Sequence, residues 1–293
     1  MKVSIVIRTL NEERYLEELL TAIADQKYDG DTEVVVVDSG SSDRTLAIAD
    51  QYEARLTYIE KAEFSFGRSL NIGCAFSTGD ILVFISGHCI PRDEHWLSQL
   101  VAPIVEKKAG YVYGRQVGRD TTKFSESRVF NQYFPDNDNT STADFFCNNA
   151  NSAIRRDVWE ALKFDEDVTG LEDMELAQRY CLSGGQVSYV SQACVFHIHN
   201  ENWKQTKHRY EREALALQSI APEIYLSLSD ALRFLFVAIL HDCAQAIEER
   251  CLLREISSIV SFRFAQYWGS YLGSRRGRAV SSKQRMNYFY PRR

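Results

Sequence analysis

The segment that decides the fold reads Asp80-Ile81-Leu82-Val83-Phe84-Ile85-Ser86-Gly87-His88-Cys89-Ile90-Pro91. Its five consecutive apolar residues, 81–85, are bounded by Gly79-Asp80 and by Ser86-Gly87. Such a run predicts a strand that is buried on both faces, as parallel sheets require. The strand ends in Ser86, Gly87 and His88. Because ligands of open α/β sheets bind beyond the carboxyl ends of the strands, the same segment also predicts a functional site.

Strands and helices alternate around this segment. Further strands are predicted at residues 3–7, 33–37, 55–59 and 111–113, with helical patterns between them, and short strands at 187–190 and 193–199. We expect Asn11 to cap the first helix, whose first turn carries Glu12 and Glu13. Alternation at this spacing predicts the α/β class, with a Rossmann-like and mostly parallel central sheet.

The C-terminal third has a different pattern. From Glu201 onward the strand signals stop, and helices are predicted at 201–219, 229–250 and 253–272. We therefore expect two domains, residues 1–210 and a helical region of residues 211–293. A basic tail without acidic residues closes the chain, with Arg275, Arg276, Arg278, Lys283, Arg285, Arg292 and Arg293. The predicted C-terminal helices carry apolar stripes and are followed by the basic residues. This pattern is compatible with helices that pack on the first domain or on a second subunit, or that contact an anionic membrane surface.

Composition excludes several classes of protein. The chain has 293 residues, 45% hydrophobic and 25% charged residues, and a formal net charge of −6, which argues against binding to nucleic acid. Its seven cysteines form no C-x-x-C pair, so we expect neither a disulfide framework nor a structural zinc site, and we expect a reducing cytosolic setting. Met1 leads directly into a predicted strand, so we expect no signal peptide. The apolar run 234–240 is too short to span a bilayer.

Polar residues at other strand and helix ends are candidates for ligand binding. Asp38 follows the strand at 33–37 and precedes Gly40 and hydroxyl side chains, so its carboxylate could accept hydrogen bonds from a nucleobase or a ribose. Capping of the turn is the structural alternative, although Asp43 is the better placed cap. Arg68 starts a predicted helix and could pair with a diphosphate, with a surface salt bridge as its alternative.

Histidines are candidates for binding a divalent cation. His88 follows the strand at 81–85, and neutral imidazole is a ligand for Mn²⁺-like and softer metals. A single histidine is more often structural than a ligand. His197 and His199 are two residues apart on a predicted strand, where side chains at this spacing point to the same face, and they supply the partners that a metal site needs.

Glu172 and Asp173 open a predicted helix. The helix dipole favours an ionised carboxylate at this position, which suits a base that removes a proton from an acceptor hydroxyl. Acidic residues also begin helices for structural reasons alone, so both interpretations stand.

Taken together, these residues resemble the inverting glycosyltransferases of family 2, which have the GT-A fold and use nucleotide-sugar donors. The resemblance covers roughly residues 1–200. It rests on an ordered series of segments: Val3-Ser4-Ile5-Val6-Ile7-Arg8-Thr9-Leu10-Asn11-Glu12, then Val37-Asp38-Ser39-Gly40-Ser41-Ser42-Asp43, then Arg68-Ser69-Leu70-Asn71-Ile72-Gly73 with Thr78-Gly79-Asp80, and then Leu171-Glu172-Asp173 with Leu176 and Arg179.

The resemblance implies roles for individual residues. Asp173 would be the catalytic base, and Glu172 would contact the acceptor. The residues that would bind the donor are Thr9, Asn11, Glu12, Asp38, Arg68, Ser86 and Gly87. Asn148, Asn149, Asn151 and Trp203 are further candidates for contact with the acceptor.

One departure concerns the metal. The family's Asp-x-Asp motif should fall where this chain has Ser86-Gly87-His88. Related GT-A transferases that add N-acetylgalactosamine to polypeptides use Asp-x-His with a later histidine. We therefore expect a Mn²⁺ or Mg²⁺ site at His88 with His197 or His199, and cationic side chains are the alternative means of stabilising the leaving diphosphate.

The segment Tyr111-Val112-Tyr113-Gly114-Arg115-Gln116, Phe134-Pro135 and the helical C-terminal third are similar to bacterial transferases that build surface polysaccharides, including rhamnosyltransferase-like ones. The resemblance implies a saccharide or lipid-linked acceptor at the inner face of the cytoplasmic membrane. Two alternatives remain. A nucleotidyltransferase would be expected to have a Gly-rich phosphate loop after the first strand, but residues 8–12 contain no glycine. A catalytically degenerate protein would bind sugar nucleotides or act as a scaffold, against which the pair Glu172-Asp173 argues.

Overall fold

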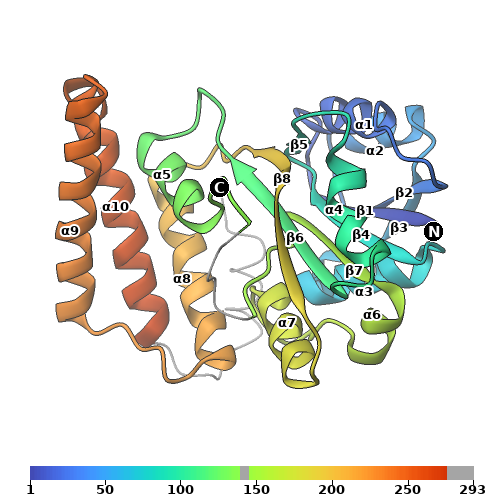
Figure 1. Cartoon of the computed structure of the whole chain (residues 1–293). Helices are drawn as coiled ribbons and strands as arrows, with labels where there is room; N and C mark the ends of the chain where they lie inside the picture. Colours follow the sequence, from blue (N-terminus) through green and yellow to red (C-terminus); the bar gives the residue numbers. More distant parts are fainter. Residues whose placement is uncertain (139–144, 276–293) are drawn as a thin grey trace. The chain divides into compact units, whose positions relative to one another are not determined.

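The computed structural model describes residues 1–138 and 145–275, which form two compact units (Figure 1). The first unit contains residues 1–119, 133–167 and 172–198, and the second contains residues 120–132, 168–171 and those from 199 onward.

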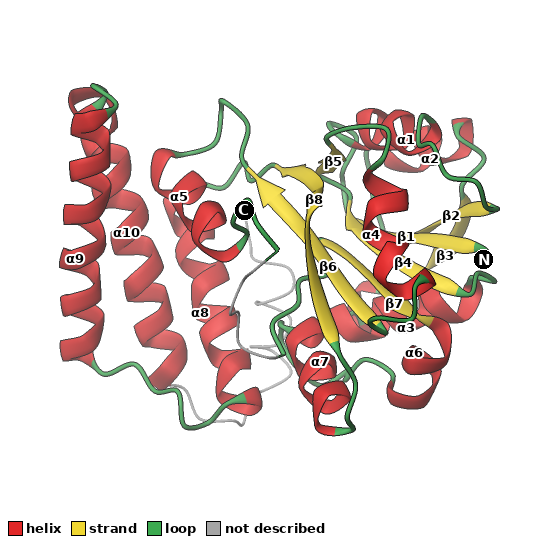
Figure 2. Cartoon of the chain, in the orientation of Figure 1, coloured by secondary structure: helices red, strands yellow, loops and turns green. Residues whose placement is uncertain are grey.

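A single mixed sheet forms the first unit. Its strands are β1 (Val3–Thr9), β2 (Thr32–Asp38), β3 (Arg55–Tyr58), β4 (Ile81–Ser86), β5 (Cys89–Pro91), β6 (Tyr111–Val117), β7 (Asn151–Arg155) and β8 (Val187–His197). Their order among the described residues is β3-β2-β1-β4-β7-β6-β8-β5. β1 pairs in parallel with β2 and β4, whereas β7 is antiparallel to β4 and β6, and β5 is antiparallel to β8. The predicted α/β class with parallel strands 3–7, 33–37, 55–59 and 81–85 is confirmed (Figure 2).

Helices pack on this sheet through apolar side chains at helical spacing. Buried residues of α1 (Leu16–Ala24), α2 (Thr45–Gln51) and α4 (Trp96–Val105) form one apolar cluster with alternate residues of β1, β2 and β4. On α3 (Phe66–Phe76), a Cβ atom at Gly73 would lie 2.5 Å from Val6 and 2.8 Å from Val37, so glycine allows this helix to approach the sheet closely. The remaining helices of this unit are η1 (Lys61–Glu63), α6 (Arg156–Leu162) and α7 (Glu172–Leu182).

Two local predictions were wrong. Asn11 does not cap the first helix, because α1 begins at Leu16 with Tyr15 at its N-cap. Asn11 has a left-handed backbone (φ 57°), and its side-chain oxygen accepts a hydrogen bond from the backbone N–H of Ser42. The two short strands expected near residue 190 are one strand, β8, because an irregularity in its pairing with β6 between Gly114 and Gln116 lets it continue past the interruption.

Helices joined by loops make up the described part of the second unit (Figure 2). Its helices are α5 (Phe124–Tyr133), which ends in the first unit, α8 (Trp203–Ile220), α9 (Leu228–Glu248) and α10 (Leu252–Arg275). A reciprocal pair of bonds between Asn202 and Gln205 caps the start of α8. The predicted helices at 201–219, 229–250 and 253–272 are confirmed to within a few residues.

α8 and α10 pack closely because α10 carries Gly269 and Gly273. A Cβ atom at Gly269 would lie 2.3 Å from the carbonyl oxygen of Lys207, and one at Gly273 would lie 2.2 Å from that of Glu211. Larger residues at these two positions would push the helices apart.

Among the described helices, none combines the length and the apolar character that a bilayer crossing requires. Arg275, the first residue of the predicted basic tail, ends α10. The other tail residues lie outside the described part of the chain: Arg276, Arg278, Lys283, Arg285, Arg292 and Arg293.

Candidate functional site

The carboxyl ends of β1, β2 and β4 bring predicted donor-binding residues together. Thr9 and Asp38 are register partners at the ends of β1 and β2, and Ser86 ends β4 opposite Arg8. The hydroxyl group of Thr9 donates a 2.9 Å hydrogen bond to Oδ2 of Asp38. The sheet therefore places Thr9, Asp38 and Ser86 along one edge, where α/β proteins bind their ligands.

Asp38 organises the turn that follows β2. Its side chain is fully buried, and Oδ1 accepts hydrogen bonds from the backbone N–H groups of Gly40 and Ser41, both at 2.8 Å. Oδ2 accepts from the hydroxyl groups of Thr9 and Ser41. Gly40 has φ +93°, a conformation that disfavours other residues. Both carboxylate oxygens thus hold the turn in place, in addition to any contact with a ligand.

Residues of the loop after β1 interlock with the same turn. The backbone N–H of Asn11 donates to Oγ of Ser41, and that of Glu12 donates to Oγ1 of Thr45. Oδ1 of Asp43 accepts from the backbone N–H of Thr45 near the start of α2. The two loops predicted to bind the donor therefore form one hydrogen-bonded structure.

Arg68 lies at the start of α3, as predicted. Its backbone N–H donates to Oγ of Ser65, the N-cap residue. Its guanidinium lies 3.5 Å from the carboxylate of Glu63 and 3.9 Å from that of Glu166. The side chain is 40% exposed, so these surface pairs contribute little to stability. A role in binding a diphosphate stays a prediction.

Glu172 and Asp173 are buried at the start of α7. Nη1 of Arg8 lies 3.1 Å from Oε1 of Glu172, and the same guanidinium packs over the ring of Phe66. Oδ2 of Asp173 accepts from the backbone N–H of Asn149 at 2.8 Å, and Oδ1 accepts from that of Met174. The carboxylate of Asp173 is therefore held in one orientation.

The surroundings of Asp173 favour its neutral form. Burial and the charge of Glu172 raise the pKa of Asp173 to about 7, against the lowering effect of the bonds from Asn149 and Met174 and of the charge of Arg8. The expected effect of the helix start, an ionised carboxylate, is thus outweighed by burial and like charge. A carboxyl group with this pKa can exchange a proton near neutral pH.

The predicted acceptor residues differ in accessibility. Asn149 is buried, and its Oδ1 accepts from the hydroxyl groups of Tyr111 and Ser152, while its Nδ2 is buried without a hydrogen-bond partner among the described residues. Asn151 is fully buried, and its amide group bonds to the carbonyl oxygens of Arg115 and Ala193. Trp203 is 54% exposed at the start of α8, in the second unit. Contact between these side chains and an acceptor stays a prediction.

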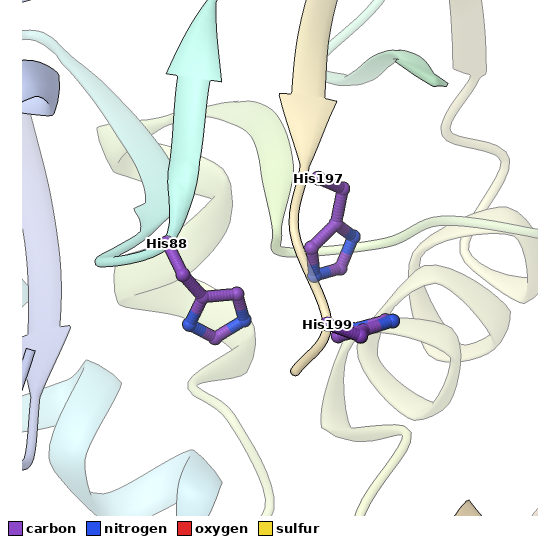
Figure 3. Close-up of side chains that lie close together, drawn as sticks. All are labelled: His88, His197 and His199. Carbon is purple, nitrogen blue, oxygen red and sulfur yellow. The ribbon is translucent and has the colours of Figure 1, made fainter. Parts of the chain in front are cut away.

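Three histidines gather where β8 ends (Figure 3). The rings of His88 and His197 stack with their centroids 5.3 Å apart. His199, two residues beyond His197, is the first residue of the second unit after β8. Each histidine can offer one nitrogen, and these atoms lie within 4.8 Å of one another. Two nitrogens that each lie 2.0–2.1 Å from the same ion are at most roughly 4 Å apart. Small rotations of the rings would therefore let them share a cation.

Each of these rings contacts an oxygen through Nδ1. The partners are Oε1 of Glu12 for His88 (3.1 Å), Oε1 of Gln116 for His197 (2.6 Å) and Oε1 of Glu126 for His199 (2.8 Å). Burial lowers the pKa of His199, and the charge of Arg209 lowers it further. Neutral imidazole, the form that binds metals, is therefore favoured at His199.

Sequence reasoning missed two residues that hold the site together. Arg8 pairs with Glu172, and Gln116 contacts His197. A charged residue next to the end of a buried strand is a signal that could have identified Arg8. No local signal marks Gln116, because its partners lie 81 and 32 residues away in the sequence.

Comparison with known proteins gives this geometry a context. The model of the family described as Glycosyl transferase family 2 matches residues 4–162. The chain is 30% identical over 223 residues to the O-antigen chain rhamnosyltransferase RfbN of Salmonella typhimurium, an alignment that covers 72% of this chain and 70% of that protein. It is also 30% identical to the O-antigen chain rhamnosyltransferase WbaN of Salmonella anatum, over 61% of this chain and 60% of that protein.

Solved structures share the fold. The mannosyltransferase PcManGT from Pyrobaculum calidifontis, in complex with GDP-Man and Mn²⁺, superposes with a TM-score of 0.64 at 19% identity and covers 99% of this chain and 88% of its own. S. aureus TarS 1-349 in complex with UDP-GlcNAc gives a TM-score of 0.56 at 17% identity, with 91% and 90% covered. The predicted GT-A architecture is confirmed. Since the family model spans more than half of its residues, the chain belongs to glycosyl transferase family 2 and is a glycosyltransferase.

Proposed function

We propose that this glycosyltransferase moves a sugar, with inversion, from a nucleotide diphosphate sugar to a hydroxyl group of a saccharide acceptor. The observation that carries the proposal is the environment of Asp173, a buried carboxyl group that the backbone of Asn149 orients and whose pKa is about 7. A base of this kind can remove a proton from a neutral hydroxyl at physiological pH.

In the proposed reaction Asp173 accepts the proton of the acceptor hydroxyl group. The oxygen forms a bond to the anomeric carbon, and the bond between that carbon and the diphosphate oxygen breaks on the opposite face. The diphosphate leaves with the bonding electrons. Glu172, Asn148, Asn149, Asn151 and Trp203 are the proposed acceptor contacts. The proposed donor contacts are Thr9, Asn11, Glu12, Asp38, Arg68, Ser86 and Gly87.

We propose that His88, His197 and His199 hold a divalent cation. Their nitrogens lie within 4.8 Å of one another, and imidazole is a common metal ligand. When bound, the cation would supply positive charge that stabilises the leaving diphosphate. The complex of PcManGT with Mn²⁺ supports dependence on a divalent cation in a protein of the same fold.

The identity of the acceptor is also a proposal. Both Salmonella relatives are O-antigen chain rhamnosyltransferases, which supports a role in the synthesis of a bacterial surface polysaccharide. We therefore propose a nucleotide-activated deoxyhexose as donor and a lipid-linked saccharide as acceptor, at the cytoplasmic face of the membrane. We also propose that residues 1–210 form the catalytic domain and residues 211–293 a helical accessory region.

The helical region exposes an apolar row that we propose contacts a second copy of the chain or a membrane surface. On α9, Leu232, Phe236, Leu240 and Ile247 are 44%, 64%, 67% and 61% exposed. Sedimentation velocity and flotation with anionic vesicles separate the two partners. Concentration-dependent association without flotation would identify a second copy, and flotation of a monomer would identify the membrane.

Hydrolysis of a panel of nucleotide sugars, with and without Mn²⁺, tests the proposed function. We expect turnover of at least one donor, faster with a saccharide acceptor, and inversion at the anomeric carbon by NMR. A chain that binds nucleotide sugars but transfers none of them to any acceptor would instead be a binding protein or scaffold.

A further inference from the structure

The hydrogen-bond network in the first unit determines which nitrogen of His197 carries a proton. Oδ1 of Asn148 accepts a hydrogen bond from the backbone N–H of Ala150 at 3.0 Å, and a backbone N–H can only donate. The atom of Asn148 at this position is therefore its oxygen. The side-chain atom of Gln116 that lies 3.1 Å from this oxygen must then be the amide nitrogen.

This assignment also identifies the other terminal atom of the Gln116 amide as the oxygen. Its oxygen faces Nδ1 of His197 at 2.6 Å, and an amide oxygen can only accept. Nδ1 of His197 consequently carries the proton, and in the neutral ring the lone pair is on Nε2. Gln116 is 1% exposed, so water does not compete for this bond.

The other two rings have the same tautomer. Nδ1 of His88 faces the carboxylate of Glu12, and Nδ1 of His199 faces that of Glu126, and a carboxylate accepts a hydrogen bond from a ring N–H. All three neutral rings therefore have their lone pair on Nε2. Contacts of this kind between Nδ1 and an oxygen are the usual support of metal-bound histidines, because they fix the ring and increase its basicity.

The donor set also limits the kind of cation. Imidazole nitrogen suits Zn²⁺, Fe²⁺, Co²⁺ and Ni²⁺, whereas Mg²⁺ prefers oxygen ligands. Among the described residues, the metal-binding cluster consists of histidines and contains no carboxylate ligand. Glu12 and Glu126 contact the rings through Nδ1 and so serve as outer partners.

We infer that His88, His197 and His199 bind a first-row transition metal through Nε2 in preference to Mg²⁺, and that Gln116 is the positioning residue that fixes His197 for this purpose. The inference refines the cation of the proposed function and rests on its metal site. Gln116 also connects that site to residue 148, next to Asn149, whose N–H orients Asp173.

Metal titration of the full chain tests the inference without any sugar nucleotide. After removal of metals with EDTA, we expect calorimetry to give one site per chain for Co²⁺ and Zn²⁺, weaker binding of Mn²⁺, and no saturable binding of Mg²⁺ at millimolar concentration. The visible absorption of bound Co²⁺ should report nitrogen ligands. Binding of Mg²⁺ as tight as that of Co²⁺ would overturn the inference.

In Gln116→Met the new side chain has a similar volume but lacks the amide oxygen that accepts the proton on Nδ1 of His197. We expect a 10–100-fold loss of Co²⁺ affinity, the range typical of outer partners of metal-bound histidines. Gln186→Met, at an exposed position, is the matched control and should leave affinity unchanged. Circular dichroism and thermal unfolding without metal check that the variants fold. Equal Co²⁺ affinity in folded Gln116→Met and Gln186→Met would remove Gln116 from this role.

The outcomes also separate the inference from the proposed function. A chain that binds Co²⁺ as expected, and loses this binding on His197→Ala, but transfers no sugar would retain the metal inference and refute transfer. A chain that transfers sugar fully in EDTA, and binds no Co²⁺, would refute the metal inference while leaving transfer in place.

Discussion

The guanidinium of Arg8 lies 3.1 Å from the carboxylate of Glu172. Arg8 is near the end of β1, and Glu172 begins α7, where Asp173 follows it. The two residues are 164 positions apart in the sequence. The positive charge of Arg8 lowers the pKa of Asp173, which burial and Glu172 raise to about 7. Arg8 therefore contributes to the fraction of Asp173 that is ionised at neutral pH.

Removing this charge should change the pH dependence of transfer. A base acts when it is deprotonated, so kcat/KM of the native enzyme should rise as pH increases through about 7. In Arg8→Gln the pKa of Asp173 should be higher, and the rise should move to higher pH. Arg14→Gln, an exposed arginine on the neighbouring loop, serves as the control. An unchanged profile in Arg8→Gln would argue that Asp173 is not the group that titrates.

Asp173→Asn should abolish most transfer. The amide cannot accept the proton, and loss of general-base catalysis typically costs 10²–10⁴-fold in rate. Affinity for the nucleotide should change little, because Asp173 bonds to the backbone of Asn149 and Met174 and is proposed to face the acceptor. Initial rates and nucleotide titration measure the two quantities, and Asp25→Asn on the surface is the control. Transfer above one tenth of the native rate would exclude Asp173 as the base.

The two aspartates of the loop after β2 should differ in their contribution to stability. Asp38→Ala leaves two backbone N–H groups and two hydroxyl groups without their acceptor, which we expect to cost about 3 kcal/mol in the free energy of unfolding. Asp43 accepts bonds from the N–H groups of Thr45 and Glu13 and from the hydroxyl group of Thr45. Because Asp43 is only partly buried, water can replace part of this bonding, and Asp43→Ala should cost about 1 kcal/mol. Urea denaturation measures both values, and nucleotide affinity should fall more in Asp38→Ala. Equal effects would show that Asp38 does not organise the turn.

A buried ion pair should contribute to the free energy of unfolding of the helical unit. Both carboxylate oxygens of Asp242 accept bonds from Arg263, at 2.7 Å and 2.9 Å, and both side chains are buried. Asp242 also accepts bonds from the hydroxyl group of Ser125 and from the guanidinium of Arg128. Asp242→Leu leaves the Arg263 charge buried and should cost about 3–5 kcal/mol. The double variant Asp242→Leu/Arg263→Leu removes that charge and should recover part of this loss, because Ser125 and Arg128 still lack their acceptor. Urea denaturation compares the variants. If the double variant were no more stable than the single one, the loss would come from packing or from the missing bonds of Ser125 and Arg128 instead of the unpaired Arg263 charge.

Much of the sheet and part of the site follow from local sequence. The apolar run 81–85 became a buried strand, because consecutive side chains of a strand point to opposite faces and five apolar ones avoid water only where both faces are covered. Asp38 could be assigned to the binding edge because it follows a buried strand and parallel strands end at the same edge of a sheet, whereas Thr9 was assigned by the resemblance to the family. The long C-terminal helices also follow from periodicity alone.

What the sequence by itself determined is therefore the class of fold, the edge of the sheet where the site lies, and the family. Only the tertiary structure decided which side chains meet there: Arg8 with Glu172, Gln116 with His197, and Asn149 and Asn151 in the interior. The physical reason is that burial of an apolar run depends on neighbouring residues, whereas a hydrogen bond between distant residues depends on the order and register in which the strands pair.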